Sequence, residues 1–82
     1  MDRMQNLQEK TKKNLERIHD RQLNEIIALR DEGMRNLEMA TTVKEAKKRS
    51  EKYTKELTEL NRRHHEELQK LHEEYVKSLL SL

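Results

Sequence analysis

Apolar residues in the first half of the chain recur at spacings of three, four and four residues, which makes a repeat of eleven. Between Met4 and Ala40, two of the three positions in each repeat are apolar, and the third is small or polar, as at Gln22 and Gly33. Eleven residues fill three helical turns almost evenly, so one stripe of side chains stays on one face, with a weak or right-handed supercoil. The pattern predicts a helix over roughly residues 2–40.

The second half repeats this spacing in a new phase and predicts a second helix over roughly residues 43–82. In this half a glutamate precedes a lysine or arginine by four residues five times, which is the order that stabilises a helix. The stripe consists of two leucine positions and one ring position, occupied by Leu57, Leu68 and Leu79, by Leu60, Leu71 and Leu82, and by Tyr53, His64 and Tyr75.

Leu37 and Leu57 hold equivalent positions in the two halves but lie twenty residues apart. At about 100° per residue, the two stripes of one continuous helix would face opposite sides, so the phase must change between them. A bend at residues 40–43 would turn the chain into an antiparallel two-helix hairpin, and Thr42 with Glu45 has the spacing of a capping box. The alternative is an antiparallel homodimer of one long continuous helix, which the lack of glycine and proline in this segment favours.

Both arrangements place residues opposite each other when their numbers add up to 82 or 83, so that Gly33 faces Ser50 and Ile18 faces His64. Gly33 either marks a close approach of the two helices or is an ordinary weak point of its helix. A polar seam residue such as His64 fixes the register of a coiled coil, and we expect protonation at about pH 6 to loosen its layer. The predicted seam residues are Leu15, Ile18, Ile26, Leu29, Leu37, Leu57, Leu60, His64, Leu68 and Leu71.

The composition agrees with long helices and limits the fold. Of the 82 residues, 41% are charged and 32% are hydrophobic, and there is one glycine and no proline. These apolar groups are too few for a compact globular core, and the abundance of Glu, Lys, Leu, Gln and Arg favours helix over disorder. We predict one all-α antiparallel coiled-coil module over residues 1–82, and we expect it to be part of a larger protein.

Catalytic, cofactor and metal chemistry find no support in the sequence. It contains no glycine-rich phosphate loop, and two helices joined by a continuous seam leave no concave pocket. His65 and His72 share a helical face near glutamates, but they lack the spacing of four residues that a helical zinc site uses. We predict no enzyme activity, no cofactor and no metal. The lack of cysteine and of long apolar runs leads us to expect a cytoplasmic protein outside the membrane.

Positive charge is concentrated at the start of the second helix. The segment Lys44–Lys55 has six basic and two acidic residues, although the net charge of the whole chain is only +2. Such a segment suits an acidic protein surface or anionic lipid; nucleic acid is not expected, because Tyr53 is its only aromatic residue. A solvated face with ion pairs inside the helix is the simpler explanation. The candidate partner-binding face comprises Arg35, Lys44, Lys47, Lys48, Lys52 and Lys55.

The segment before the expected bend resembles a known family. Residues 32–42 read EGMRNLEMATT. This is similar to the E-G-x-x-N-L-x-x-A-T-T sequence that ends the first long helix in the homology-region-one repeats of protein kinase N and rhophilin. The resemblance implies an antiparallel helical finger that turns just after the last threonine and binds an activated Rho-family GTPase on its surface. Family members usually have a longer loop with glycine or proline there, whereas this chain continues directly with Val43.

Together these patterns predict a non-enzymatic coiled-coil module that binds a protein partner, with a Rho-family GTPase as the first candidate. The alternative function is structural, in which the coiled coil dimerises or spaces a larger cytoskeletal or trafficking scaffold. The sequence leaves the antiparallel homodimer open beside the hairpin.

Overall fold

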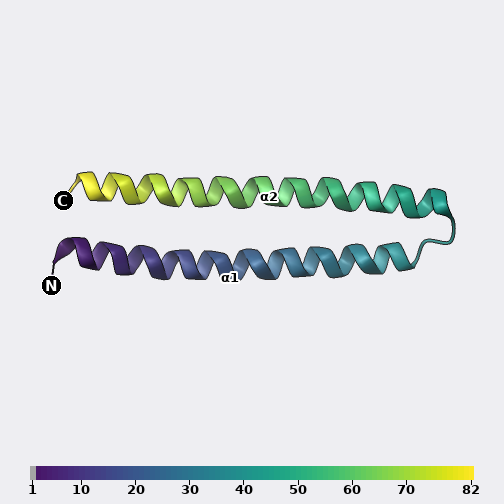
Figure 1. Ribbon diagram of the computed structural model, residues 1–82, viewed down its shortest axis with the longest axis horizontal. Coiled ribbons are helices and arrows are strands. Elements are labelled where there is room, and N and C mark those ends of the chain that lie inside the picture. The colour runs from purple at the N-terminus through teal and green to yellow at the C-terminus, as the bar shows by residue number, and fades with distance from the viewer. Residues whose placement is uncertain (1) are drawn as a thin grey trace.

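The chain folds into two long helices that lie side by side and run in opposite directions (Figure 1). The computed structural model describes residues 2–82, in which α1 spans Arg3–Glu38 and α2 spans Val43–Leu80. It measures 62 × 17 × 7 Å, and its radius of gyration of 18.8 Å exceeds the roughly 12 Å of a compact domain of this length. The predicted all-α antiparallel hairpin is confirmed, and the single continuous helix of the alternative does not form.

A connection of four residues, 39–42, joins the helices. Thr42 is the N-cap of α2, and its hydroxyl accepts a hydrogen bond from the backbone N–H of Glu45 at 3.1 Å. The Glu45 carboxylate reaches back one residue further than a capping box predicts, and accepts from the backbone N–H (3.0 Å) and the hydroxyl (2.9 Å) of Thr41. No residue in the described range has a positive φ, so the connection forms without glycine.

The buried and half-buried side chains of both helices follow the repeat of three, four and four residues. Leu37 differs from the expectation, because its side chain is 46% exposed and Asn36 takes the half-buried position. At this end of α1, Arg49 crosses from α2 and donates to the Asn36 carbonyl at 3.0 Å. The other expected seam residues are all buried or half-buried, namely Leu15, Ile18, Ile26, Leu29, Leu57, Leu60, His64, Leu68 and Leu71.

The register of the two helices differs from the predicted one by about one helical turn. Gly33 lies against the ring of Tyr53, and the Gln22 amide donates a hydrogen bond to the backbone carbonyl of His64 at 3.2 Å. The residue numbers in both pairs add up to 86 rather than 82 or 83, because the first turn of α2 extends past the end of α1 (Figure 1). A shift of three or four residues returns to the same helical face, so the seam residues stay the same while their partners change.

This register matches like with like along the seam. Polar Gln22 meets His64 at the same level, whereas the predicted register set the apolar Ile18 against that histidine. Opposing apolar side chains shield each other from water, and opposing polar groups satisfy each other's hydrogen bonds. The pairs of large apolar seam residues that the observed register brings level are Leu7 with Leu79, Leu15 with Leu71, Ile18 with Leu68, Ile26 with Leu60, and Leu29 with Leu57.

The interior of the hairpin is narrow, and its best-covered layer is polar. Leu60 is the only buried apolar side chain among residues 2–82, with 6% of its surface exposed. Gln22 and His64 are covered equally well, at 6% and 8% exposure. Two helices shield their shared seam on only one side each, so most apolar seam residues remain half-exposed. A two-helix hairpin of this kind keeps little apolar surface from water by itself.

Candidate functional site

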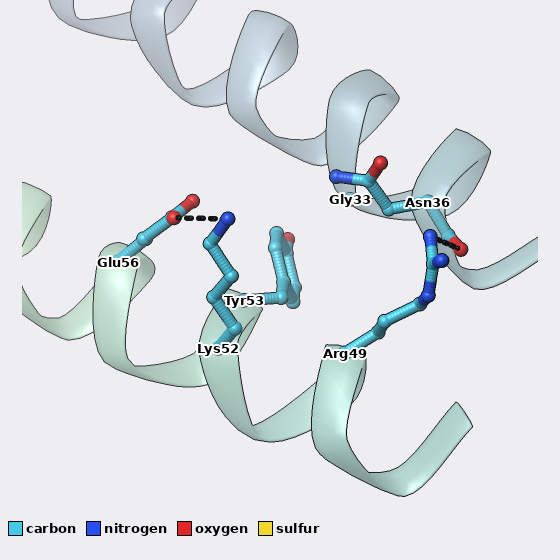
Figure 2. Close-up of a pocket in the computed structure, with 6 residues that line it drawn as sticks. All are labelled: Gly33, Asn36, Arg49, Lys52, Tyr53 and Glu56. Carbon is cyan, nitrogen blue, oxygen red and sulfur yellow. Dashed lines mark hydrogen bonds and ion pairs between the residues drawn. The ribbon is translucent and has the colours of Figure 1, made fainter. Parts of the chain in front are cut away.

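Five lysines of the candidate partner-binding face lie on the first turns of α2, next to the bend, and all five are exposed. Lys52 forms an ion pair with Glu56 at 3.9 Å (Figure 2). Within the described part of the chain, the other four lysines form no ion pair. Intrahelical ion pairs therefore do not account for this concentration of charge.

Arg35 does not join these lysines. It follows Gly33 by two residues, about 200° around α1 from the seam, and Lys55 follows Tyr53 in the same way on α2. The outward faces of two packed helices point in opposite directions, so Arg35 and Lys55 lie on opposite sides of the hairpin. We use the name lysine surface for the remaining residues of the face, which are Lys44, Lys47, Lys48, Lys52 and Lys55.

Arg49, the sixth basic residue of the segment, supports the bend instead of extending this surface. It is half-buried, donates to the Asn36 carbonyl at 3.0 Å, and lies 3.6 Å from the Glu45 carboxylate. Hydrogen bonds from Thr41, with the positive charge of Arg49 beside them, lower the pKa of Glu45. One of the two acidic residues in the segment is thus engaged at the bend and does not neutralise the lysine surface.

A hollow of about 280 Å³ opens between the helices beside the lysine surface (Figure 2). The Tyr53 side chain rises from α2 towards Gly33, with Arg49 on one side and Lys52 and Glu56 on the other. A Cβ at position 33 would lie 2.5 Å from the Tyr53 Cδ2 atom, so only glycine leaves room for the ring. Gly33 therefore marks a close approach of the two helices rather than a weak point of α1.

Hydrogen-bonded polar side chains cross the middle of the seam. The Gln22 amide donates to the His64 carbonyl at 3.2 Å and to the Glu67 carboxylate at 2.9 Å. Glu25 lies 3.1 Å from the His64 Nε2 atom and accepts a bond from Arg21 at 2.6 Å. Arg21 also contacts Glu67 and so links the two helices. We call these five residues the polar layer.

Hydrogen bonds lower the pKa of both carboxyl groups in the polar layer. The largest effect on Glu25 is its bond with His64, and the largest on Glu67 is the bond from Gln22; Arg21 assists both. The bond with Glu67 in turn raises the pKa of Arg21. The His64 ring faces the Glu25 carboxylate instead of Ile18. The loosening of this layer that the sequence suggested stays a prediction.

The described part of the chain contains neither a cluster of metal ligands nor a helix that could span a membrane. Among residues 2–82, no three histidine, aspartate or glutamate side chains are grouped to hold a metal ion. His65 and His72 are both exposed on α2. Over the same residues, neither helix combines the length and the apolar character that crossing a lipid bilayer requires.

No family model matches this chain, and comparisons with curated proteins and with solved structures gave no match either. The resemblance of residues 32–42 to the homology-region-one repeats stays a prediction. In the structure α1 ends at Glu38, and the Ala-Thr-Thr of this segment lies in the connection before α2. The chain therefore turns within the Ala-Thr-Thr, whereas the resemblance places the turn just after the last threonine.

Sequence reasoning missed the polar layer and the packing of Tyr53 on Gly33, although both left a signal. Gln22 and His64 are polar residues at seam positions, and Gly33 and Tyr53 are the smallest and one of the largest. If polar Gln22 is paired with polar His64, and small Gly33 with large Tyr53, the residue numbers add up to 86 in both pairs. Arg49 also left a signal, because it lies eleven residues before Leu60 and so continues a seam position of the repeat.

Proposed function

We propose that this hairpin is a non-enzymatic interaction module whose bend-proximal end binds an acidic surface of a partner protein. The lysine surface carries the proposal, because four of its five side chains have no ion pair in the described structure. Unpaired charges on one surface produce a field that steers an oppositely charged partner and speeds its association. The Glu45 carboxylate is engaged by Thr41 and Arg49 at the bend, which leaves Glu51 as the only other acidic residue of the segment 44–55.

Exposed apolar groups at the bend support the same proposal. Met39 is 68% exposed and Val43 is 86% exposed, and both lie next to the start of the lysine surface. Protein interfaces combine an apolar centre with a polar rim, and methionine is enriched in them. The end of the hairpin presents these two elements together, about 60 Å from the chain termini.

An activated Rho-family GTPase is the first candidate for the partner. This choice rests on the resemblance of residues 32–42 and on the position of that segment at the bend. The proposal carries with it the cytoplasmic location expected from the sequence.

The test is binding of the 82-residue chain to a panel of GTP-loaded Rho, Rac and Cdc-type GTPases, measured by isothermal titration calorimetry. We expect the charge-reversal variant Lys48→Glu/Lys55→Glu to weaken binding by at least tenfold and to reduce its dependence on salt. The matched control is Lys10→Glu/Lys13→Glu, which reverses two exposed lysines near the open end. Absence of binding to every GTPase rejects this partner, and equal weakening by both variants rejects the lysine surface.

A structural role is the second candidate function. The hairpin buries one apolar side chain within residues 2–82 and leaves several others more than one-third exposed. A dimerisation or spacer element of a cytoskeletal or trafficking scaffold would cover such residues in an assembly. Helicity that rises with protein concentration, in a chain without affinity for the GTPases, supports this second function over the first.

A further inference from the structure

The two broad faces of the hairpin differ in charge. One face carries the bridges between the helices, including the contact of Arg21 with Glu67 and that of Glu25 with His64. On the other side of α2, a stripe of eleven exposed positions contains a single charged residue, although 41% of the chain is charged. The positions of this uncharged stripe are Val43, Lys47, Ser50, Thr54, Thr58, Asn61, His65, Gln69, His72, Val76 and Leu80.

Two hydroxyl groups in this stripe are already hydrogen-bonded within α2. Thr54 donates to the Ser50 carbonyl at 3.0 Å, and Thr58 donates to the Thr54 carbonyl at 2.8 Å. A protein surface laid over them would therefore leave these two hydroxyls satisfied, and would cover mainly their methyl groups. At Thr54 and Thr58, α2 can thus be covered without leaving a hydroxyl group unpaired.

A ridge of large apolar side chains borders the same face on α1. It consists of Leu23, Ile27, Met34 and Leu37, which are 57%, 37%, 56% and 46% exposed. Met34 and Leu37 line a hollow of about 100 Å³ together with Ser50 of the uncharged stripe, so ridge and stripe adjoin. Exposed apolar side chains that follow one line of a helix mark a surface that a partner covers.

Ridge and stripe lie at the same level along the hairpin. Because facing residue numbers add up to 86, the ridge at 23–37 is level with residues 49–63 of α2. That range contains the small side chains Ser50, Thr54 and Thr58. Across this face, the large side chains of α1 thus lie level with small side chains of α2.

A two-fold axis parallel to the helices would set the α1 ridge of one copy against the α2 stripe of a second copy. It places α1 of one copy over α2 of the other, antiparallel and at the same level, which is the neighbour relation of an antiparallel four-helix bundle. The ridge of each copy then packs into the low stripe of its partner, as ridges pack into grooves. Arg30, the charged residue within the ridge, comes to lie over Thr54 and Thr58 and away from its own symmetry mate.

The exposed area of the chain is large enough for such an interface. The hairpin exposes 7054 Å², whereas a compact monomer of 10.0 kDa exposes about 5,200 Å². The excess is more than twice the roughly 800 Å² that each partner contributes to a standard interface.

We propose that the face formed by the α1 ridge and the uncharged α2 stripe binds a second copy of this chain, giving an antiparallel four-helix bundle of two hairpins. The inference does not depend on the acidic partner at the bend, because the ridge and the stripe share only Val43 and Lys47 with the surface proposed for that partner. It gives the structural function a defined face and a defined partner.

Sedimentation equilibrium between about 10 µM and 1 mM chain tests this proposal. We expect a species of twice the 10.0 kDa mass, with the 62 Å length of the hairpin preserved in small-angle scattering. Met34→Glu and Thr54→Glu each place a charge in the interface, and we expect each to weaken the dimer at least tenfold. The control Met39→Glu makes the same change at the exposed bend and leaves the dimer unchanged.

Circular dichroism at matched concentrations shows whether each variant remains helical. A chain that stays monomeric over the whole range overturns the proposal. A dimer that both ridge and stripe variants leave intact also overturns it, as does a dimer about twice as long as the hairpin, since its chains would have opened into continuous helices.

Discussion

The ring of Tyr53 occupies the space that a side chain at Gly33 would need: a Cβ there would lie 2.5 Å from Cδ2 and 3.0 Å from Cε2. These are atoms of a rigid ring close to its own backbone, so they cannot move aside without a shift of α2. The contact pins the register of the helices near the bend, and it turns the one glycine of the chain into a structural requirement.

Replacing Gly33 by alanine is expected to destabilise the hairpin by about 1 kcal/mol. The gain in helix propensity is about 0.5–1 kcal/mol, and overpacking against the ring costs about 1–3 kcal/mol. Urea unfolding followed by circular dichroism measures the difference. In a Tyr53→Ala background the same Gly33→Ala change should instead stabilise. An increase in stability with Tyr53 present would show that the ring and the glycine do not constrain each other.

Replacing both Gln22 and His64 by leucine is expected to raise the melting temperature and to loosen the choice of register. An all-apolar seam gains burial, but it no longer distinguishes alignments that differ by one turn, about 5.4 Å. Distances between two spin labels at the open end should change from one population to two. Gln5→Leu, at an exposed position of α1, is the control and should keep one population. A single distance in the double variant would assign the register to other contacts.

Acid is expected to weaken the hairpin through Glu25 and Glu67. Their pKa values are lowered from 4.5 in the folded chain, mainly by His64 and by Gln22. A lowered pKa stabilises the fold above the ordinary value, and this contribution disappears as the pH falls through the folded pKa. The urea midpoint should therefore fall between pH 6 and pH 3.

The variant Glu25→Gln/Glu67→Gln should flatten this pH dependence, because neither amide titrates. Glu9→Gln, which changes an exposed glutamate of α1, serves as the control and should retain the slope of the unaltered chain. If the double variant keeps the full slope, the acid sensitivity comes from groups outside the polar layer.

Thr42→Ala is expected to lower the stability by about 1 kcal/mol, because the backbone N–H of Glu45 in the first turn of α2 loses its side-chain acceptor. Thr58→Ala is the matched control, since that hydroxyl bonds only a carbonyl of its own helix. Thermal unfolding of both variants at low concentration measures the difference. Equal melting temperatures would mean that the Glu45 bonds to Thr41 hold the bend without the cap.

The spacing of apolar residues was sufficient to predict the helices, the bend and most of the seam. Each position of the repeat fixes a helical face. Leu37 is the one predicted seam residue that is exposed, and it lies at the end of α1 where Arg49 donates to the Asn36 carbonyl. The alignment of the helices was not predicted, because a slide of one turn presents the same faces. What selects among these alignments is the fit of particular side chains, such as Tyr53 on Gly33 and Gln22 with His64.

The candidate binding surface was predicted in part. Charge alone identified the lysine segment, but the directions of Arg35 and Arg49 depend on where the seam runs and how far α2 extends. The uncharged stripe of α2 went unnoticed, since its residues are polar by type. Only the paired Thr54 and Thr58 hydroxyls show that it can be covered.

Both termini lie at one end of the hairpin (Figure 1). A pulling force applied through them would act on the outermost pair of residues first and would part the seam layer by layer, starting at Leu7 and Leu79. The bend would bear no load until the polar layer had opened. Under tension the two helices should therefore separate at low force and in steps, beginning at the open end of the hairpin.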